Sequence, residues 1–242
     1  MYVKFVYFEA EIPYERSLST IVIAIDGPAA SGKSTTARLV AERLGYLHID
    51  TGAMYRAMTL KALREGIDTK DTESVERLAE GTEIRLEREK GRLKVLVDGK
   101  DVTEAIRNPD VDRAVSAVSS YRKVRSVMVR EQRRMGQRGG VVFEGRDIGT
   151  VVFPDADLKI YMVADVEERA RRRQRELQAK GITADLNVLM EEIVVRDEKD
   201  SRRSVSPLRK ADDAIIVDTS AMTIDRQVNF IVEKAREIIR AK

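Results

Sequence analysis

Short apolar runs recur along the chain, separated by longer stretches with helical spacing. The runs predict five strands, which lie at residues 21–25, 46–49, 141–143, 158–163 and 214–217. Strands that alternate with helices in this way indicate an α/β fold with a mostly parallel sheet and right-handed crossovers. We therefore expect a three-layer α/β/α core around a sheet of about five strands.

Helical spacing is clearest over residues 33–44, where Ala37, Val40, Ala41 and Leu44 place apolar side chains on one face. Gly45 follows as a predicted C-cap. The remaining predicted helices lie at residues 52–65, 121–137, 165–179, 186–201 and 224–241.

Residues 67–120 differ in pattern from the rest of the chain. Two alternating runs, 83–87 and 92–97, flank Glu89-Lys90-Gly91 and predict a β-hairpin. Such alternation is typical of a small antiparallel sheet with one solvated face, so we interpret the segment as a subdomain inserted into the core. Residues 1–20 alternate weakly and then become polar, which fits either an extra edge strand or an N-terminal extension.

Composition narrows the class of protein. The chain has no cysteine, which excludes a disulfide framework, thiolate metal ligands and a cysteine nucleophile. The net charge of +3 does not demand a nucleic-acid partner, although arginines cluster at 130–134 and 169–175. No stretch is apolar and long enough to span a bilayer, and the N-terminus lacks signal-peptide features. We expect a cytoplasmic monomer that binds neither membrane nor nucleic acid.

One motif directly indicates phosphate chemistry. The pattern G-x-x-x-x-G-K-[ST] is matched by Gly27-Pro28-Ala29-Ala30-Ser31-Gly32-Lys33-Ser34. It follows a β-branched strand and opens a helix, as a P-loop requires. Glycines let the backbone N–H groups turn inward, and these groups together with the helix N-terminus bind phosphate oxygens. The loop and Thr35 are therefore predicted to bind ATP, with Lys33 on the β- and γ-phosphates and Ser34 as a ligand of Mg²⁺.

A P-loop alone does not identify the phosphate acceptor. A GTPase would need a guanine-reading Asn-Lys-x-Asp segment, which the chain lacks, and an ATPase motor is usually larger. The remaining class is that of kinases of small molecules.

Two further segments follow predicted strands, at the edge where α/β sheets bind ligands. The first contains Asp50 and Thr51 as helix caps, then Tyr55 and Arg56, which could pack a base and hold a phosphate. Taken alone, it is more simply a capped helix with a surface arginine. The second is Glu144-Gly145-Arg146-Asp147-Ile148-Gly149-Thr150. It offers a Walker-B-like carboxylate and an arginine–aspartate pair between glycines, although a salt-bridged turn explains it equally well.

Two other features remain open on spacing alone. Arg196, Asp200 and Arg203 fall at i, i+4 and i+7 on one predicted helix face, where they could orient a phosphate and a sugar hydroxyl. A solvated ion-pair ladder is the simpler interpretation. His48 is the only histidine, and we interpret it as a packed strand residue rather than a catalyst.

Taken together, these segments resemble the bacterial-type cytidylate kinases, which are nucleoside monophosphate kinases. The resemblance covers about residues 21–240 and includes the 196–208 segment. It implies transfer of the γ-phosphoryl of ATP to CMP or dCMP, with Mg²⁺ as cofactor. It also implies three parts: a core (21–66, 121–164 and 202–242), an NMP-binding insert (67–120) and a helical lid (165–201) in which Arg169 and Arg173 are candidates for phosphate contact.

The resemblance also implies roles for individual residues. It places the acceptor phosphate near Arg56, Arg146 and Arg203, with Lys33, Arg146 and Arg203 as catalytic residues. It assigns cytosine recognition to Ser116, Arg125 and Asp147, and the sugar hydroxyls to Arg196 and Asp200. Thr51 and Tyr55 complete the implied CMP site. The chain departs from the family at residues 1–20 and at Glu144, where members often carry Asp.

Two alternatives stay open from the residues. One is a P-loop kinase of another small acceptor, such as AMP, UMP or shikimate. The other is a P-loop nucleic-acid-binding protein, for which the basic helices at 121–138 and 165–180 are the best support.

Overall fold

The structure is a computed structural model, and it describes residues 20–89, 92–179 and 181–242. These residues pack as two compact units. The core unit comprises the described parts of Ser19–Ile49 and Gly136–Lys242, and the inserted unit comprises those of Asp50–Met135. The expectation for residues 1–20 falls, apart from Thr20, outside the described residues.

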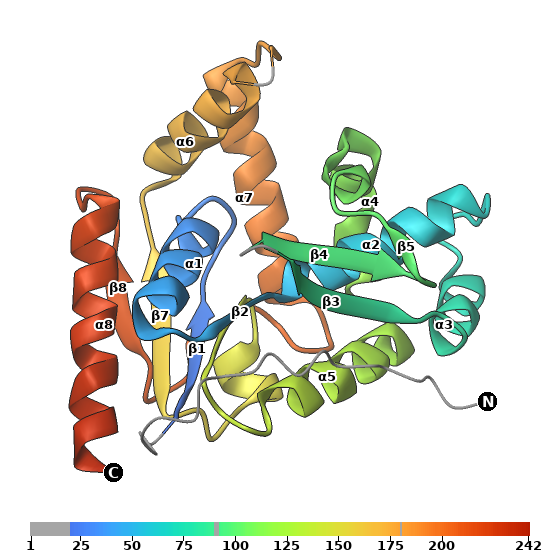
Figure 1. Cartoon of the computed structure of the whole chain (residues 1–242). Coiled ribbons are helices and arrows are strands. Elements are labelled where there is room, and N and C mark those ends of the chain that lie inside the picture. Colours follow the sequence, from blue (N-terminus) through green and yellow to red (C-terminus); the bar gives the residue numbers. More distant parts are fainter. Residues whose placement is uncertain (1–19, 90–91, 180) are drawn as a thin grey trace. The chain divides into compact units, whose positions relative to one another are not determined.

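A five-stranded sheet forms the centre of the core unit, as the apolar runs predict (Figure 1). Its order is β2-β6-β1-β7-β8, and β1 pairs in parallel with both β6 and β7, while β7 pairs in parallel with β8. The strands are β1 (Val22–Asp26), β2 (Leu47–Asp50), β6 (Val141–Gly145), β7 (Leu158–Val163) and β8 (Ile215–Asp218). The carboxyl ends of β1 and β6 lie side by side, because Asp26 is in register with Gly145.

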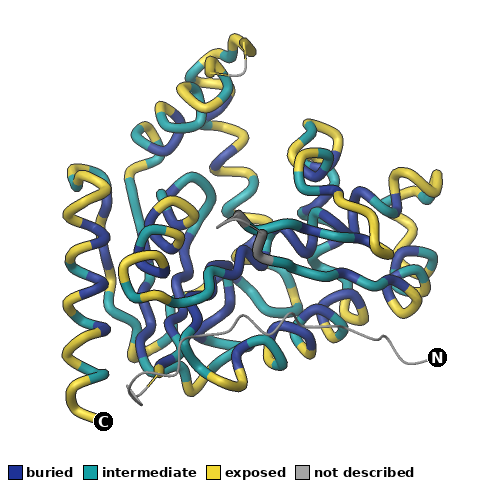
Figure 2. The backbone as a smooth tube through the Cα atoms, in the orientation of Figure 1, coloured by how far each residue is buried: buried dark blue, intermediate teal, exposed yellow. Residues whose placement is uncertain are grey.

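The helical elements of the core unit include the helices predicted for it and a π-helical turn that the sequence interpretation missed. They are α1 (Lys33–Leu44), the π-helical turn η2 (Ile148–Val152), α6 (Val166–Gln178), α7 (Leu186–Arg202) and α8 (Ile224–Ala241). Helices α1 and α8 pack against each other and share one hydrophobic cluster with β1. Figure 2 shows α8 with one buried face and one exposed face, as expected of an amphipathic helix. Gly45 ends α1 in a left-handed conformation (φ 69°), which confirms the predicted cap.

The inserted unit combines a small sheet with helices. The predicted hairpin is confirmed, with β3 antiparallel to β4 and a short β5 completing the sheet; Lys90 and Gly91 of its turn lie outside the described residues. The elements are α2 (Thr51–Arg64), α3 (Thr72–Glu80), β3 (Ile84–Glu89), β4 (Arg92–Val97), β5 (Lys100–Asp101), the 3₁₀ turn η1 (Ala105–Arg107), α4 (Pro109–Val118) and α5 (Arg122–Gly136).

The sequence interpretation missed the two helices α3 and α4. Both carry ordinary start signals: the Asp71 side chain accepts from the Ser74 N–H, and the Asn108 side chain accepts from the Val111 N–H before Pro109 at the first turn. Each helix is short, with 9 residues in α3 and 10 in α4, and buries only two or three of them. Among the described residues, no helix is long and apolar enough to cross a membrane.

Gly27 is the position where the fold depends most strictly on a missing side chain. Its φ is +149°, and a Cβ there would lie 2.1 Å from the Met162 carbonyl oxygen of β7. That oxygen belongs to the sheet backbone, so it has little freedom to move. Gly45 also has a positive φ, but a Cβ there would meet nothing within 4 Å.

We expect Gly27→Ala to lower the free energy of unfolding by at least about 3 kcal/mol, because backbone strain and a steric clash add. Gly45→Ala is the matched control, with an expected loss of about 1 kcal/mol from the left-handed backbone alone. Urea unfolding of both variants measures the difference. Equal losses in the two variants would contradict the close approach of Gly27 to β7.

Candidate functional site

The phosphate loop leads from β1 into α1, as the motif predicts. Gly32 adopts φ +93° directly before the first helical residue, so the first-turn N–H groups of α1 are available to a ligand. The Lys33 ammonium donates to the Pro28 carbonyl (2.6 Å) and to the Ser31 hydroxyl (3.3 Å), which folds the lysine over its own loop. Burial lowers the pKa of Lys33 well below its usual value, with nearby Arg146 acting in the same direction. A polyanion bound in this loop would supply the opposing charge.

Asp26 fixes the entrance of the loop. Its carboxylate accepts from the Ile148 N–H (2.9 Å) and the Gly149 N–H (2.8 Å), which are the first residues of η2. One buried side chain thereby joins the end of β1 to the segment that carries Arg146 and Asp147. Burial raises the pKa of Asp26 to about 6, while the two N–H donors act against that rise.

The ion pair of Arg169 on α6 and Asp197 on α7 contacts the loop at Ala29. Arg169 donates to the Ala29 carbonyl (3.2 Å) and pairs with Asp197, whose other oxygen accepts from the Ala29 N–H (3.3 Å). Arg169 was predicted to belong to a lid, and the structure shows it against the phosphate loop. Arg173, the other candidate, forms an ion pair with Glu176 on its own helix (3.3 Å).

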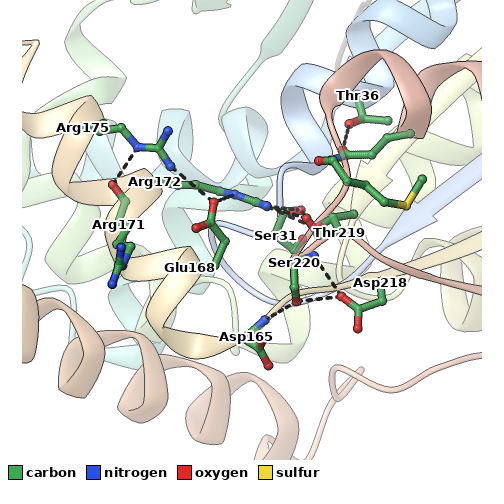
Figure 3. A network of polar contacts seen from close by, with 12 residues as sticks. Ser31, Thr36, Asp165, Glu168, Arg171, Arg172, Arg175, Asp218, Thr219 and Ser220 are labelled. Atoms are coloured by element: carbon green, nitrogen blue, oxygen red, sulfur yellow. Dashed lines mark hydrogen bonds and ion pairs between the residues drawn. The ribbon is translucent and has the colours of Figure 1, made fainter.

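Arg172 links the same loop to the segment after β8 (Figure 3). Its guanidinium donates to the Ser31 carbonyl (3.2 Å) and to the Thr219 carbonyl (2.7 Å), while Glu168 holds its Nε (2.9 Å). The fully buried Thr219 hydroxyl also donates to the Ser31 carbonyl (2.9 Å). Two donors from distant parts of the chain therefore fix one peptide of the phosphate loop.

Glu144 is the penultimate residue of β6 and is almost fully buried. The Ser34 hydroxyl donates to its Oε2 at 2.6 Å, and the His48 Nε2 lies 3.0 Å from its Oε1. The sequence interpretation left Glu144 without a firm role. The structure places it against Ser34, the residue predicted to bind Mg²⁺.

The predicted acceptor residues of the core unit form two ion pairs. Arg146 donates to Asp200 (3.0 Å), and Arg203 lies 3.6 Å from Asp147. The side chains of Arg203 and Asp147 are both buried. Arg196 is carried by α7 together with Asp200. The structure therefore brings two arginines and two carboxylates of the prediction together after β6.

The predicted helical register of Arg203 is wrong. Helix α7 ends at Arg202, and Arg203 has an extended backbone (ψ 141°). Pro207 follows shortly and cannot continue a helix, while the Leu208 N–H donates back to the Asp200 carbonyl at 2.8 Å. Arg203 therefore reaches Asp147 from the segment after the helix rather than from the helix face.

The inserted unit holds the other predicted residues. Thr51 begins α2 after its cap Asp50, which accepts from the Ala53 N–H (3.0 Å) and from Arg107 (3.0 Å). The Arg125 guanidinium lies over the Tyr55 ring, 5.2 Å from the centroid, and donates to the Ser119 carbonyl (3.0 Å).

Arg56 and Ser116 lie on helices that pack together within this unit. Arg56, on α2, pairs with Asp112 of α4 at 3.4 Å, and Ser116 lies one turn further along α4.

Comparison with known proteins identifies the family. The sequence profile described as cytidylate kinase matches residues 23–237. The chain is 49% identical over 223 residues to the cytidylate kinase of Bacillus subtilis (strain 168), covering 92% of this chain and 98% of the relative. The chain belongs to the cytidylate kinase family.

Other relatives agree with this assignment. The cytidylate kinase of Pelotomaculum thermopropionicum is 52% identical over 213 residues, covering 88% of this chain and 94% of that one. A shikimate kinase structure from Bacteroides thetaiotaomicron aligns with a TM-score of 0.46 at 12% identity, covering 92% of this chain and 99% of that one. This similarity is too low to support a functional inference. The predicted family resemblance is confirmed.

The phosphate loop and the segment beside it are held by residues to which the sequence interpretation assigned no role. These are Asp26, Arg172, Asp197 and Thr219, while Glu144 was noted without a firm role. Asp26 could have been suspected, because an acid directly before a P-loop at the end of a buried strand is an unusual place for a charge. Arg172 lies within the recognised arginine run, but spacing does not distinguish it from its exposed neighbours. No local signal marks Thr219.

The raised pKa of Asp26 gives a pH prediction with a definite sign. The folded protein holds a proton on Asp26 up to about pH 6, whereas the unfolded chain releases it near the ordinary value of 3.8. The difference in the free energy of unfolding between the wild type and Asp26→Asn (wild type minus variant) should therefore fall by roughly 2 kcal/mol between pH 4 and pH 7. Denaturant titrations across this range measure it, and a difference that stays flat or rises would contradict the burial cost of this carboxylate.

The two hydrogen-bond donors to the Ser31 carbonyl, Arg172 and Thr219, predict an effect on nucleotide binding. Arg172→Ala removes one of the two donors to the Ser31 carbonyl, so we expect the dissociation constant for ATP to rise roughly tenfold. Arg171→Ala is the matched control, because Arg171 lies on the same helix with an exposed ion pair to Glu167 (2.5 Å). Calorimetric titration with ATP compares the two. Equal affinities in both variants would contradict a role of the Arg172–Ser31 hydrogen bond in ATP binding.

Proposed function

We propose that this chain transfers the γ-phosphoryl group of ATP to CMP or dCMP, giving ADP and CDP or dCDP. The observation that carries this proposal is the cluster of Arg146, Asp147, Asp200 and Arg203 after β6, within the same unit as the phosphate loop. Two guanidiniums suit an acceptor phosphate, and two carboxylates suit a base amine and sugar hydroxyls. The cytidylate kinase family of the chain supports this reading of the cluster.

The donor side follows from the phosphate loop. The N–H groups of the loop and of the first turn of α1 bind the phosphate oxygens of ATP, and Lys33 stabilises charge on the transferred group. Mg²⁺ fits this arrangement as a hard cation held by the Ser34 hydroxyl together with phosphate oxygens. Among the described residues no group of three or more His, Cys, Asp or Glu side chains could hold a metal, which agrees with a cation bound mainly by its nucleotide. When bound, Mg²⁺ neutralises charge on the phosphates.

The acceptor side uses the family's residues. We assign the acceptor phosphate to Arg56, Arg146 and Arg203, which reduce the repulsion between two anions. The sugar hydroxyls fall to Arg196 and Asp200. No general base is needed if the CMP phosphate enters as a dianion, so positioning and charge stabilisation provide the catalysis.

Base selection rests on hydrogen bonding. We assign cytosine to Ser116, Arg125 and Asp147, with Thr51 and Tyr55 lining the remainder of the CMP site. Cytosine presents an exocyclic amine that a carboxylate can accept from. Uracil presents an acceptor at that position, which would leave a buried carboxylate without its donor.

Helices α6 and α7 are the proposed lid. Arg169 and Arg173 are its proposed phosphate contacts, and Arg169 already lies against the loop at Ala29. Closure of the lid would exclude water and so suppress hydrolysis of ATP. We further propose that the enzyme acts as a monomer.

A coupled assay of ADP formation across CMP, dCMP, UMP and AMP tests this function. We expect kcat/KM for CMP to exceed that for AMP by at least about 100-fold and that for UMP by at least about tenfold, because a site that reads polar groups rejects analogues that leave them unpaired. A preference for AMP or UMP would refute the assignment of Asp147. Absence of turnover with every monophosphate would refute the proposed function.

A further inference from the structure

His48, Glu144 and Ser34 form a polar chain across three elements of the core unit. Glu144 is the penultimate residue of β6, His48 lies on the neighbouring strand β2, and Ser34 is the second residue of α1. The two contacts of the glutamate use different oxygens: Oε2 accepts from Ser34 at 2.6 Å, and Oε1 lies 3.0 Å from the His48 Nε2. The carboxylate therefore bridges a strand and the phosphate-binding helix.

The contact with His48 has a definite chemical direction. A carboxylate can only accept hydrogen bonds, so the Nε2 of His48 must carry the proton that it shares with Glu144. The glutamate side chain is 4% exposed and that of His48 is 17% exposed, so water has little access to replace this bond. His48 therefore does more than pack within its strand.

Glutamate has an extra rotatable bond compared with aspartate, and fixing it reduces side-chain entropy. Without a contact on Oε1, the carboxylate would be freer to rotate and to take the Ser34 hydroxyl with it. A second anchor on the other oxygen restricts that rotation. His48 is placed to be that anchor, because β2 and β6 are adjacent strands.

We propose that His48 is a positioning residue for nucleotide binding, acting through Glu144 on the Ser34 hydroxyl. This inference rests on the proposed function, since Ser34 is the residue assigned to MgATP. Partners in the outer shell of a metal site typically change metal affinity 10- to 100-fold when they are removed. In this chain the outer shell would be a histidine–glutamate pair rather than a carboxylate alone.

The variant His48→Phe keeps a ring of similar size and removes the donor. We expect the dissociation constant of MgATP, measured by calorimetry, to rise roughly tenfold, with the KM for CMP unchanged. Tyr46→Phe is the matched control: Tyr46 lies near the start of the same strand, and its hydroxyl accepts from the Ile21 N–H (3.3 Å) instead of contacting Glu144. That variant should bind MgATP like the wild type.

A double-mutant comparison separates positioning from general damage. Glu144→Asp shortens the side chain, so it can no longer contact Ser34 and His48 in the same geometry. In that background His48→Phe should add little to the loss. A further tenfold loss in that background would overturn the proposal, as would unchanged MgATP binding in His48→Phe or an equal change in the KM for CMP.

One readout is independent of activity. Because His48 is the only histidine, the imidazole signals in a ¹⁵N NMR spectrum come from this ring alone and show which nitrogen carries the proton. We expect the proton on Nε2 in the nucleotide-free protein, and a proton on Nδ1 alone would overturn the contact. These outcomes are distinct from a failure of the proposed function, which would show as wild-type protein without CMP kinase activity.

Discussion

The phosphate loop is held in shape by side chains from distant parts of the chain rather than by regular backbone pairing. Asp197 and Arg169 bind the N–H and the carbonyl of Ala29, and Arg172 and Thr219 bind the carbonyl of Ser31. A loop that must point its N–H groups at a ligand cannot also satisfy them internally. Its remaining carbonyls therefore need outside donors, and the arginines of α6 supply two of them. This constraint links the helices after β7 to the nucleotide site.

A second consequence concerns charge. The core unit concentrates Lys33, Arg146, Arg169 and Arg203 around carboxylates that are mostly buried. Buried ions are costly unless they are paired and hydrogen-bonded. The ion pairs of Arg146, Arg169 and Arg203 supply that compensation. Bound nucleotides would bring negative charge, so part of this pairing is expected to give way to contacts with phosphate when substrates bind.

Much of this arrangement follows from local sequence. The five apolar runs, the caps of α1 and α2 and the Gly27–Ser34 motif depend on residues close together in the chain, and the structure confirms the elements they predict. The helices α3 and α4 were missed although each begins at an ordinary capping residue, because they are short and lie in a segment that was interpreted from its β-hairpin. The hydrogen bonds that hold the loop from outside were missed for another reason. Arg172 and Thr219 are 47 residues apart, and only the fold shows that both meet Ser31. Arg203 was misplaced because spacing alone extended α7 beyond Arg202.

Under the proposed function, the Lys33 ammonium, which lies 2.6 Å from the Pro28 carbonyl oxygen, stabilises charge on the transferred phosphoryl group. Turnover of purified Lys33→Ala with ATP and CMP tests this most directly, with thermal unfolding to confirm that the variant is folded. We predict a folded protein whose kcat falls by at least about 100-fold, as expected when a preorganised charge is removed from a transition state. A folded variant with near-normal turnover would contradict this role of Lys33.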